Sequence, residues 1–496
     1  MAKTACKVVG LLFSLLLLAI GVAVLLAFPG VYHLLIKRNV VLAYKKTGFD
    51  SWVNPPFPIY FKVWMWNLTN ADDVLKGAKP NVTQVGPYTY RETKNKENVT
   101  FLSSDEEISY TTLSQYEFVS DMSVENANPM IDKITSINIP YLTVVNMVSF
   151  WGDKEKSEVK LAALFTGSHV FESHTVDELL WGYEDPLLKL IALQKPGLVP
   201  STVFGLFAGK NNSDDGVYVV DSGKTDPSRT SSIKTYKGNS SLTFWTTNTT
   251  NMINGTDGTY YHPFIDKSEP LYVFSSDICR SIQASYEKPI DVEGLIADRF
   301  VGTPEDFQNT TLNPANLGFC TPNASYCLPG GLLNVSNCHQ DAPVVMSLPH
   351  FLFAEEKVLE MLDGDINPIK EKHQTSFDLE PITGGPLQVF KRLQINIHQK
   401  AYKDMPAFQN LPNAYLPILW LEESSVVTPE YAKQLEWMTL KIWVVVHISQ
   451  WLFIGLGILL SIIMVSCLLS GTRNSSDLAR PVNAPSENSP LLGNKA

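Results

Sequence analysis

Apolar residues are concentrated in two long runs, one at each end of the chain. The first run, residues 8–28, has 21 positions without a charged side chain, and the second occupies 442–469. A helix needs about 20 apolar residues to cross a bilayer. The pattern predicts two transmembrane helices, at 8–32 and 442–469, with a cytosolic amino terminus at 1–7, an ectodomain at 33–441 and a cytosolic tail at 470–496.

The first run has an alternative interpretation as a cleaved signal peptide. Lys3 and Lys7 form a basic segment before it, and residues 25–27 could serve as a cleavage site. The apolar core of a signal peptide is only about 7–15 residues long, however, and this run is longer. An uncleaved signal anchor is therefore the preferred interpretation.

Between the two runs, short stretches rich in β-branched and aromatic residues alternate with Gly, Pro and Asn, as is typical of strands. Within 391–398, apolar and polar residues alternate, which predicts a strand with one buried face. The prediction is one α+β ectodomain, mainly β, with an antiparallel sheet or barrel and helices packed on it. The predicted strands are 57–69, 141–151, 216–223, 270–276, 389–398 and 415–423, and helical spacing occurs near 154–165, 175–193 and 354–362.

Composition and charge narrow the classes of function. The net charge of −11 argues against nucleic acid as a partner, because nucleic acid requires a basic footprint. The sequence contains no H-E-x-x-H or G-x-S-x-G motif and no histidine spacing typical of a metal site. Neither an enzyme nor a cofactor is therefore predicted, and the carboxylate pairs at 214–215 and 422–423 are interpreted as solvated surface residues.

The region between the apolar runs is rich in N-x-[ST] acceptor sequences for N-glycosylation. About four would be expected by chance from its asparagine content, and more than twice as many are present. N-glycosylation takes place only in the secretory pathway, so the ectodomain is predicted to be luminal or extracellular. The acceptors are Asn67, Asn81, Asn98, Asn211, Asn239, Asn248, Asn254, Asn309, Asn323 and Asn334.

Four of the six cysteines, Cys279, Cys320, Cys327 and Cys338, lie within one stretch of the ectodomain. An even number is expected in an oxidising compartment. Three pairings are possible, and the simplest closes a short loop between Cys320 and Cys327 and joins the other two. A zinc site that includes His339 is the alternative, although the spacing matches no common zinc pattern.

The cytosolic segments carry two candidate signals. Cys6 and Cys467 lie at the cytosolic edges of the two predicted spans, where they are either inert thiols or sites of palmitoylation. In the tail, Glu487 precedes Leu491 and Leu492 in a segment rich in Ser, Asn and Pro. This spacing resembles an acidic dileucine signal for a clathrin adaptor. It predicts residence in lysosomal and late endosomal membranes, with a minor pool at the plasma membrane.

Several motifs follow one another across the ectodomain. They are FDSWVNPPFPIYFKVWMWNLTN at 49–70, VGPYTYRE at 85–92, HTVDELLWGYEDP at 174–186, NMINGTDG at 251–258, LYVFSSDICRS at 271–281, GFC and LLNVSNC within 318–338, and RLQINIH at 392–398. With the two terminal anchors and the tail signal, this series resembles the class B scavenger receptor family. The resemblance implies an antiparallel β-barrel ectodomain with an apical helical bundle near 150–195, an interior lipid tunnel, and disulfides Cys279–Cys338 and Cys320–Cys327.

A lysosomal member of this family carries acid β-glucocerebrosidase from the endoplasmic reticulum and releases it at lysosomal pH. The resemblance therefore implies a trafficking receptor, with His174 as the pH sensor and Leu161, Leu164 and Phe165 as a docking patch on the apical helices. Alternatively, His174 could support a helix cap, and the three apolar side chains could pack into the bundle. The alternative function is a scavenger-type lipid or lipoprotein receptor or a lysosomal cholesterol transporter without hydrolase cargo.

Overall fold

The computed structural model describes residues 2–339 and 342–477. The chain divides into two compact units, one formed by Met1–Leu35 with Leu435–Ala496 and the other by Ile36–Gln434. The second unit contains the predicted ectodomain fold. The predicted sorting residues Glu487, Leu491 and Leu492 lie outside the described residues.

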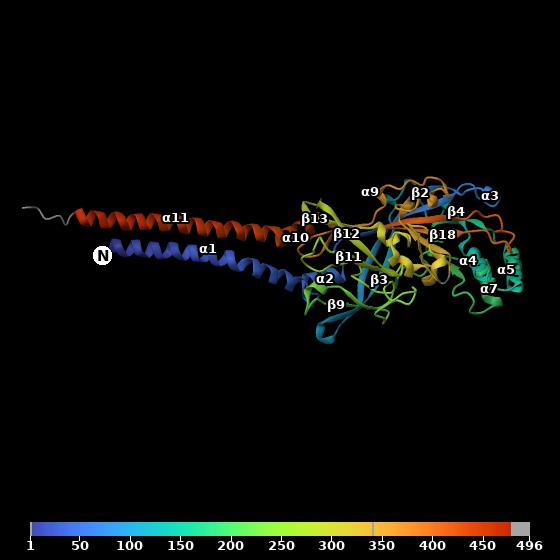
Figure 1. The fold of residues 1–496 in the computed structure, drawn as a ribbon, viewed down its shortest axis with the longest axis horizontal. Helices are drawn as coiled ribbons and strands as arrows, with labels where there is room; N and C mark the ends of the chain where they lie inside the picture. Colours follow the sequence, from blue (N-terminus) through green and yellow to red (C-terminus); the bar gives the residue numbers. More distant parts are fainter. Residues whose placement is uncertain (1, 340–341, 478–496) are drawn as a thin grey trace, which may run out of the picture. The chain divides into compact units, whose positions relative to one another are not determined.

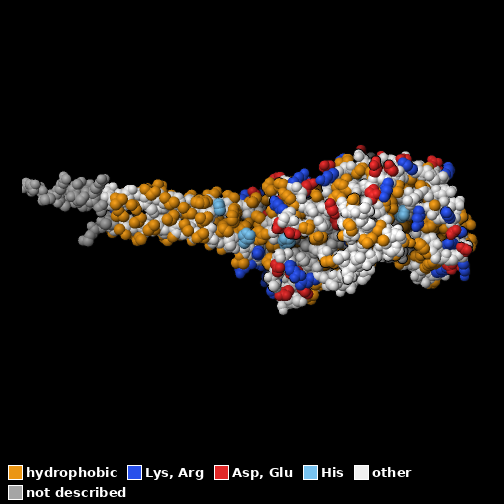
Figure 2. All heavy atoms as spheres, in the orientation of Figure 1, with side chains coloured by type: hydrophobic (Ala, Val, Ile, Leu, Met, Phe, Trp, Pro, Cys, Tyr) orange, Lys and Arg blue, Asp and Glu red, His pale blue; other side chains and the backbone are white. Residues whose placement is uncertain are grey.

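The unit formed by the chain ends consists of two long apolar helices, α1 (Ala2–Val40) and α11 (Ile442–Asp477). They contact one another, since the hydroxyl oxygens of Ser14 and Ser461 are 2.9 Å apart. Hydrophobic side chains cover much of the surface of both helices (Figure 2). Both are long and apolar enough to cross a membrane.

The ectodomain unit is built on one large sheet that is almost entirely antiparallel (Figure 1). Its strand order is β10-β9-β3-β2-β1-β19-β18-β17-β13-β12-β11. These strands are β1 (Ile59–Leu68), β2 (Asn81–Leu102), β3 (Glu107–Phe118), β9 (Tyr218–Asp221), β10 (Ile233–Tyr236), β11 (Leu271–Ser275), β12 (Arg280–Val292), β13 (Leu295–Gly302), β17 (Ser376–Leu379), β18 (Pro386–Gln399) and β19 (Ala414–Val426).

Eight shorter strands complete the β-structure. Four of them branch from strands within the large sheet, and the other four form two separate two-stranded sheets, β4 with β5 and β6 with β7. The branching strands are β8 (Ser213–Asp214), β14 (Leu333–Asn334), β15 (Val344–Ser347) and β16 (Asp363–Gly364). The separate strands are β4 (Lys133–Ile137), β5 (Phe171–Thr175), β6 (Tyr183–Glu184) and β7 (Val203–Phe204).

The centre of the sheet is formed by β1, β18 and β19, which the residue pattern predicts. The expectation of one buried face within 391–398 is wrong, because Gln394 and Asn396 on the polar face are fully buried. Strand β15 pairs with β18 and lies directly beside them, with Val345 opposite Asn396 and Ser347 opposite Gln394. Their amides donate hydrogen bonds to the hydroxyl of Ser347, so the polar groups are satisfied without water.

The interpretation of residues 422–423 as solvated surface residues is wrong for Glu422, whereas Glu423 is partly exposed. Glu422 is buried, and its carboxylate pairs with the Lys62 ammonium at 2.9 Å and with the Arg392 guanidinium at 2.8 Å. Glu423 lies on the opposite face of the same strand and pairs with Lys94 at 2.8 Å. Charged residues in a central strand are stable here because each has an opposite charge within contact distance.

No pair of described strands closes the large sheet, so the expected closed barrel is not found. Strands β10 and β11 stand at its two ends, and the segment Gly255–Thr256 lies between them. The carbonyl of Gly255 accepts a hydrogen bond from the Ile233 amide in β10 at 2.8 Å, and Thr256 exchanges backbone hydrogen bonds with β11. An irregular segment therefore joins the two ends of the sheet.

Nine helices belong to the described part of the ectodomain unit, and α4, α5 and α7 lie together at one end of it (Figure 1). These three are named the apical helices. The helices are α2 (Thr47–Val53), α3 (Ala71–Val74), α4 (Ile139–Val148), α5 (Asp153–Thr166), α6 (Val176–Trp181), α7 (Pro186–Gln194), α8 (Glu356–Leu359), α9 (Lys370–His373) and α10 (Pro429–Glu436).

Helix α4 corrects the prediction of a strand at 141–151. The side chain of Asn138 caps its first turn by accepting a hydrogen bond from the Tyr141 amide, and Pro140 stands at the start, where a missing N–H does no harm. Seven of its ten residues are buried, which explains a composition that is apolar on all sides. The single helix expected near 175–193 is instead two helices, α6 and α7, separated by β6.

Candidate functional site

Helix α5 exposes a row of large apolar side chains to solvent. Leu161, Leu164 and Phe165 are 53, 78 and 76% exposed. The alternative that they pack into the helical bundle is therefore wrong. The residues that face the bundle are Val159, Ala162 and Ala163, which follow the same helical spacing on another side of α5.

The position of α5 is fixed by its ends and by two ion pairs. The helix ends at Gly167, whose φ of 71° is left-handed and suits a residue without a Cβ. Lys156 contacts the Asp404 carboxylate at 2.8 Å, and Lys195 contacts Glu158 at 2.6 Å. These contacts hold the helix so that its apolar row faces solvent.

The exposed apolar surface is larger than the sequence predicts. Phe150 and Trp151, in the turn before α5, and Leu193, near the end of α7, are exposed as well. The sequence signal was the pair of adjacent aromatic residues at 150–151, which was assigned to a strand. Large exposed apolar side chains that gather on neighbouring elements are typical of a protein or membrane contact surface.

His174 lies in β5 between two carboxylates. Its Nε2 is 3.2 Å from a carboxylate oxygen of Glu172, and its Nδ1 is 3.6 Å from Glu178. The imidazole stacks on the ring of Tyr183 in β6, with ring centres 4.1 Å apart. Protonation of His174 would therefore create attractive contacts with both carboxylates.

Glu178 links His174 to the start of helix α6. Its carboxylate accepts a hydrogen bond from the Thr175 amide at 2.9 Å, while the Thr175 hydroxyl accepts one from the Glu178 amide, so the two residues form a capping box. The Thr175 amide lowers the pKa of Glu178. Burial raises the pKa of Glu172, but hydrogen bonds from His174 and from the His169 amide outweigh it and lower the pKa overall.

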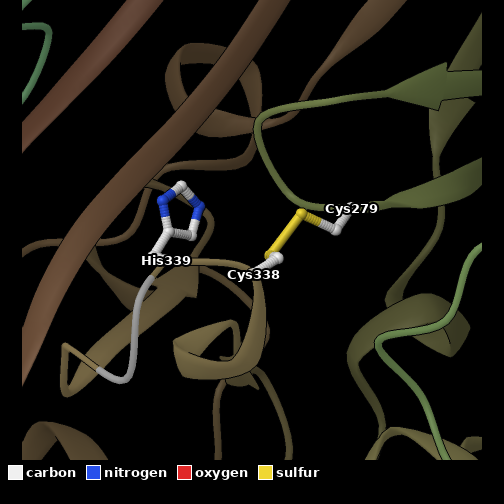
Figure 3. A group of neighbouring side chains, drawn as sticks. All are labelled: Cys279, Cys338 and His339. Carbon is white, nitrogen blue, oxygen red and sulfur yellow. A yellow bond between two sulfur atoms is a disulfide. The ribbon is translucent and has the colours of Figure 1, made fainter. Parts of the chain in front are cut away.

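The four ectodomain cysteines form two disulfides, Cys279–Cys338 and Cys320–Cys327. These are the pairings that the resemblance implies. Figure 3 shows His339 beside the first disulfide, whose sulfur atoms are bonded to each other and so are not free thiolates for a metal. The His339 Nε2 instead lies 2.9 Å from the carbonyl oxygen of Asp277.

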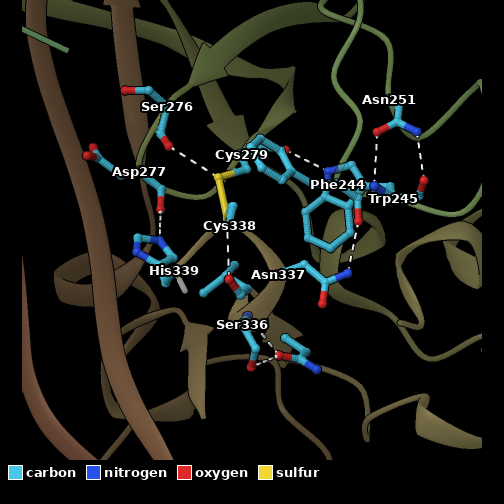
Figure 4. The surroundings of a disulfide bond; sticks show 12 residues. Phe244, Trp245, Asn251, Ser276, Asp277, Cys279, Ser336, Asn337, Cys338 and His339 are labelled. Atoms are coloured by element: carbon cyan, nitrogen blue, oxygen red, sulfur yellow. Dashed lines mark hydrogen bonds between the residues drawn. A yellow bond between two sulfur atoms is a disulfide. The ribbon is translucent and has the colours of Figure 1, made fainter. Parts of the chain in front are cut away.

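The Cys279–Cys338 disulfide is surrounded by ordered polar contacts (Figure 4). The indole N–H of Trp245 donates to the Cys279 carbonyl at 2.7 Å, and the Asn337 amide donates to the carbonyl of Phe244 at 3.1 Å. The turn between β11 and β12 is thereby fastened to the segment before β15.

The predicted modification sites are all accessible. None of the ten acceptor asparagines is buried: Asn98, Asn211, Asn239, Asn248 and Asn323 are exposed, and the other five are partly exposed. Cys6 and Cys467 are unpaired and exposed. Their accessibility is compatible with glycosylation and palmitoylation, and both remain predictions.

Comparison with known proteins assigns this chain to a family. The family model described as the CD36 family matches residues 10–468. The chain belongs to the CD36 family. Lysosome membrane protein 2 of Rattus norvegicus is 38% identical over 95% of this chain and 97% of the relative, and the Homo sapiens protein of that name has the same identity and coverage. Scavenger receptor class B member 1 of Bos taurus is 32% identical over 92% of this chain and 87% of the relative.

Family membership accounts for the main features of the chain. These CD36-family relatives are named as a lysosome membrane protein and a scavenger receptor, and neither name denotes an enzyme. Together with the two terminal apolar helices, the likeness to lysosome membrane proteins fits a lysosomal membrane protein with a luminal ectodomain. The chain is a membrane receptor of the CD36 family.

Proposed function

We propose that this protein is a lysosomal receptor that binds acid β-glucocerebrosidase through its apical helices and releases it in the acidic lumen. The observation that carries the proposal is the exposed apolar row of α5. Leu164 and Phe165 are more than three-quarters exposed, although burying them would be favourable by about 1.5–3 kcal/mol each. A partner that buries these side chains would gain this free energy on binding, and the fold of the receptor would not have to change.

Release at acidic pH is proposed to begin at His174. The imidazole stacks on Tyr183, and Glu178 caps α6. A proton on the ring attracts the carboxylates of Glu172 and Glu178. The Glu178 carboxylate then interacts with His174 as well as with the Thr175 amide, which weakens its hydrogen bond to the cap. Asp185, at the start of α7, adds to the negative field around the ring. The protonation state of His174 is thereby coupled to α6 and α7.

The proposal includes passage of lipid or sterol through the interior of the sheet. The irregular segment Gly255–Thr256 supports closure of the sheet into a barrel. On the face that carries Phe61, the carboxylate of Glu423 pairs with both Lys94 and Lys391, yet each of the three side chains is between 21 and 30% exposed. Charged groups that stay accessible on the core face of a sheet support an open space beside them.

These features also support the alternative function, a scavenger-type lipid or lipoprotein receptor, or a cholesterol transporter, that carries no hydrolase. In either case the cytosolic tail is proposed to bind a clathrin adaptor through Glu487, Leu491 and Leu492. The two functions differ in whether the apical surface binds the enzyme.

The test is binding of acid β-glucocerebrosidase to the full chain in lipid nanodiscs at pH 7 and at pH 5. The proposal expects binding at pH 7 that is lost at pH 5, and expects His174→Gln to retain binding at both values. Leu164→Ser should weaken binding at pH 7. The matched control is Leu312→Ser, an equally exposed leucine outside the apical helices.

Absence of binding at both pH values would refute the hydrolase receptor and favour the lipid receptor. Equal loss of binding in Leu164→Ser and Leu312→Ser would refute the apical surface as the docking site. A wild-type pH response in His174→Gln would remove this histidine from the mechanism.

A further inference from the structure

A cleft of about 760 Å³ lies on the face of the sheet opposite Phe61 and Leu421. Its floor is formed by side chains of β1, β2, β18 and β19, and one wall by residues 365–373. This volume lies within the range of about 300–1,000 Å³ that is typical of small-molecule sites. The cleft is separate from the apical helices and from the core face of the sheet.

Aromatic rings form the floor and one side of the cleft. The indoles of Trp64 and Trp420 stack in parallel with ring centres 3.7 Å apart, and the imidazoles of His350 and His373 stack at 4.1 Å. The ring of Trp420 packs edge-to-face with both histidine rings, with centres 6.1 and 5.7 Å apart. Flat apolar surface is therefore available to a ligand with a flat apolar face.

Two neutral donors at the cleft lack an acceptor among the described residues. The side-chain oxygen of Gln84 accepts from the Trp420 indole at 2.7 Å and contacts His350 Nε2 at 2.9 Å, which leaves the Gln84 NH₂ group unused. His373 Nδ1 accepts from the Ile369 amide, so its neutral ring carries hydrogen on Nε2, where no described residue accepts it. His373 lines the cleft, so this Nε2–H can donate to the oxygen of a ligand bound there.

The charged groups on the cleft floor are already matched. The Glu422 carboxylate holds Lys62 at 2.9 Å and Arg392 at 2.8 Å. An ionic ligand on the floor would have to displace one of these partners, and a purely hydrocarbon ligand would leave the neutral donors unpaired. The other charged side chains of the cleft stand at the wall and are Asp365, Glu371 and Lys372.

The chemistry of the cleft is maintained in an acidic compartment. Burial lowers the pKa of His350 to about 4 and that of His373 to about 3. Both rings therefore stay neutral at about pH 5, in contrast to an exposed histidine. A ligand held here at neutral pH would keep the same donors in the lysosome.

We infer that this cleft is a carbohydrate-binding site that takes a neutral hexose ring, stacked against Trp64 and hydrogen-bonded by Gln84 and His373. A sugar ring combines an apolar C–H face with hydroxyl groups that accept from neutral donors, which is the combination that the cleft offers. Two sources share this chemistry, the N-linked glycan of a glycoprotein and the headgroup of a glycolipid. The inference does not depend on the proposed function.

The test uses the full chain in nanodiscs after enzymatic removal of its own N-glycans. Saturation-transfer NMR and tryptophan fluorescence measure the binding of a high-mannose oligosaccharide, which represents a glycoprotein glycan, and of lactose, which represents a glycolipid headgroup. We expect one of the two to bind with an affinity that differs by less than about twofold between pH 7 and pH 5, since a twofold change is about 0.4 kcal/mol.

Trp64→Phe is expected to weaken sugar binding at least about fivefold, because it removes stacking area and the indole N–H. The matched control is Trp151→Phe, a tryptophan beside α5 that should leave sugar binding unchanged. Independently of any variant, the bound sugar should slow hydrogen exchange of the amides in 365–373 of the wild-type protein.

Three results would overturn the inference. They are the failure of both sugars to bind, equal affinity in Trp64→Phe and the wild type, and sugar binding without protection of 365–373. Preference for the oligosaccharide identifies a glycoprotein ligand, and preference for lactose identifies a glycolipid.

Discussion

The buried histidine pair should make the ectodomain less stable in acid by an amount that can be calculated. His350 and His373 are 6 and 4% exposed, and burial lowers their pKa values to about 4 and about 3. In the unfolded chain a histidine titrates near pH 6.5. As the pH falls from 7 to 5, the unfolded state binds a proton at each site while the folded state does not, so acid favours unfolding.

The size of the effect follows from the same values. Each histidine should lower the free energy of unfolding by about 2 kcal/mol between pH 7 and pH 5, and the pair by about 4 kcal/mol. The loss begins below about pH 6.5 and continues until the pH passes the folded pKa values. Above pH 7 the two histidines contribute no pH dependence, because they are neutral in both states.

The assay is urea unfolding followed by tryptophan fluorescence at pH 7 and pH 5, with the wild type and His350→Asn compared. Asparagine suits this position because its side-chain oxygen can accept from the Asn367 amide as Nδ1 does, and because it tolerates the left-handed φ of 54°. The variant should reduce the difference in unfolding free energy between the two pH values by about 2 kcal/mol. An unchanged difference would refute the assignment of a neutral buried ring, and His169→Asn, at an exposed position, controls for the loss of a histidine.

Three further predictions concern the apical surface, the core and the disulfides. Phe165→Ser should weaken binding of the hydrolase about tenfold with little change in melting temperature, because its side chain is 76% exposed; a large loss of stability would contradict this. Asp378→Asn should destabilise the ectodomain by about 3–5 kcal/mol in urea unfolding, since it leaves Arg299 without its buried partner at 2.7 Å; a loss below about 1 kcal/mol would refute it. Replacing Cys279 and Cys338 by serine removes a disulfide that links positions 59 residues apart, and should lower the free energy of unfolding by about 4 kcal/mol in the same assay. An unchanged free energy of unfolding would exclude a structural role for this disulfide.

The strands at the centre of the fold were predictable because their composition and their structure agree. Residues 57–69 and 415–423 are rich in β-branched and aromatic residues, and they form β1 and β19. Residues 141–151 have a similar composition but form α4, because the Asn138 cap and Pro140 start a helix there. Composition alone does not separate a buried helix from a buried strand over so short a stretch.

Helix α5 shows a different limit of sequence reasoning. Leu161, Leu164 and Phe165 follow helical spacing, and so do Val159, Ala162 and Ala163. Either row could face the bundle by periodicity, and bulk would favour the larger side chains as the core. The structure buries the smaller row, since small side chains allow α5 to lie close to α4 and α7. Which of the two rows stays exposed therefore depends on tertiary packing and could not be predicted from the sequence.

Histidine chemistry in this ectodomain depends on what surrounds each ring. His174 lies between Glu172 and Glu178, so a proton on it gains two opposite charges and a connection to the cap of α6. His350 and His373 lie against each other and against Trp420, so a proton on either gains no carboxylate contact within 4 Å among the described residues. Acidification can therefore change the apical region while the cleft keeps its donors. One receptor could thus release a partner at one surface and retain a neutral ligand at another, and the contrast between His174→Gln and His350→Asn separates the two effects.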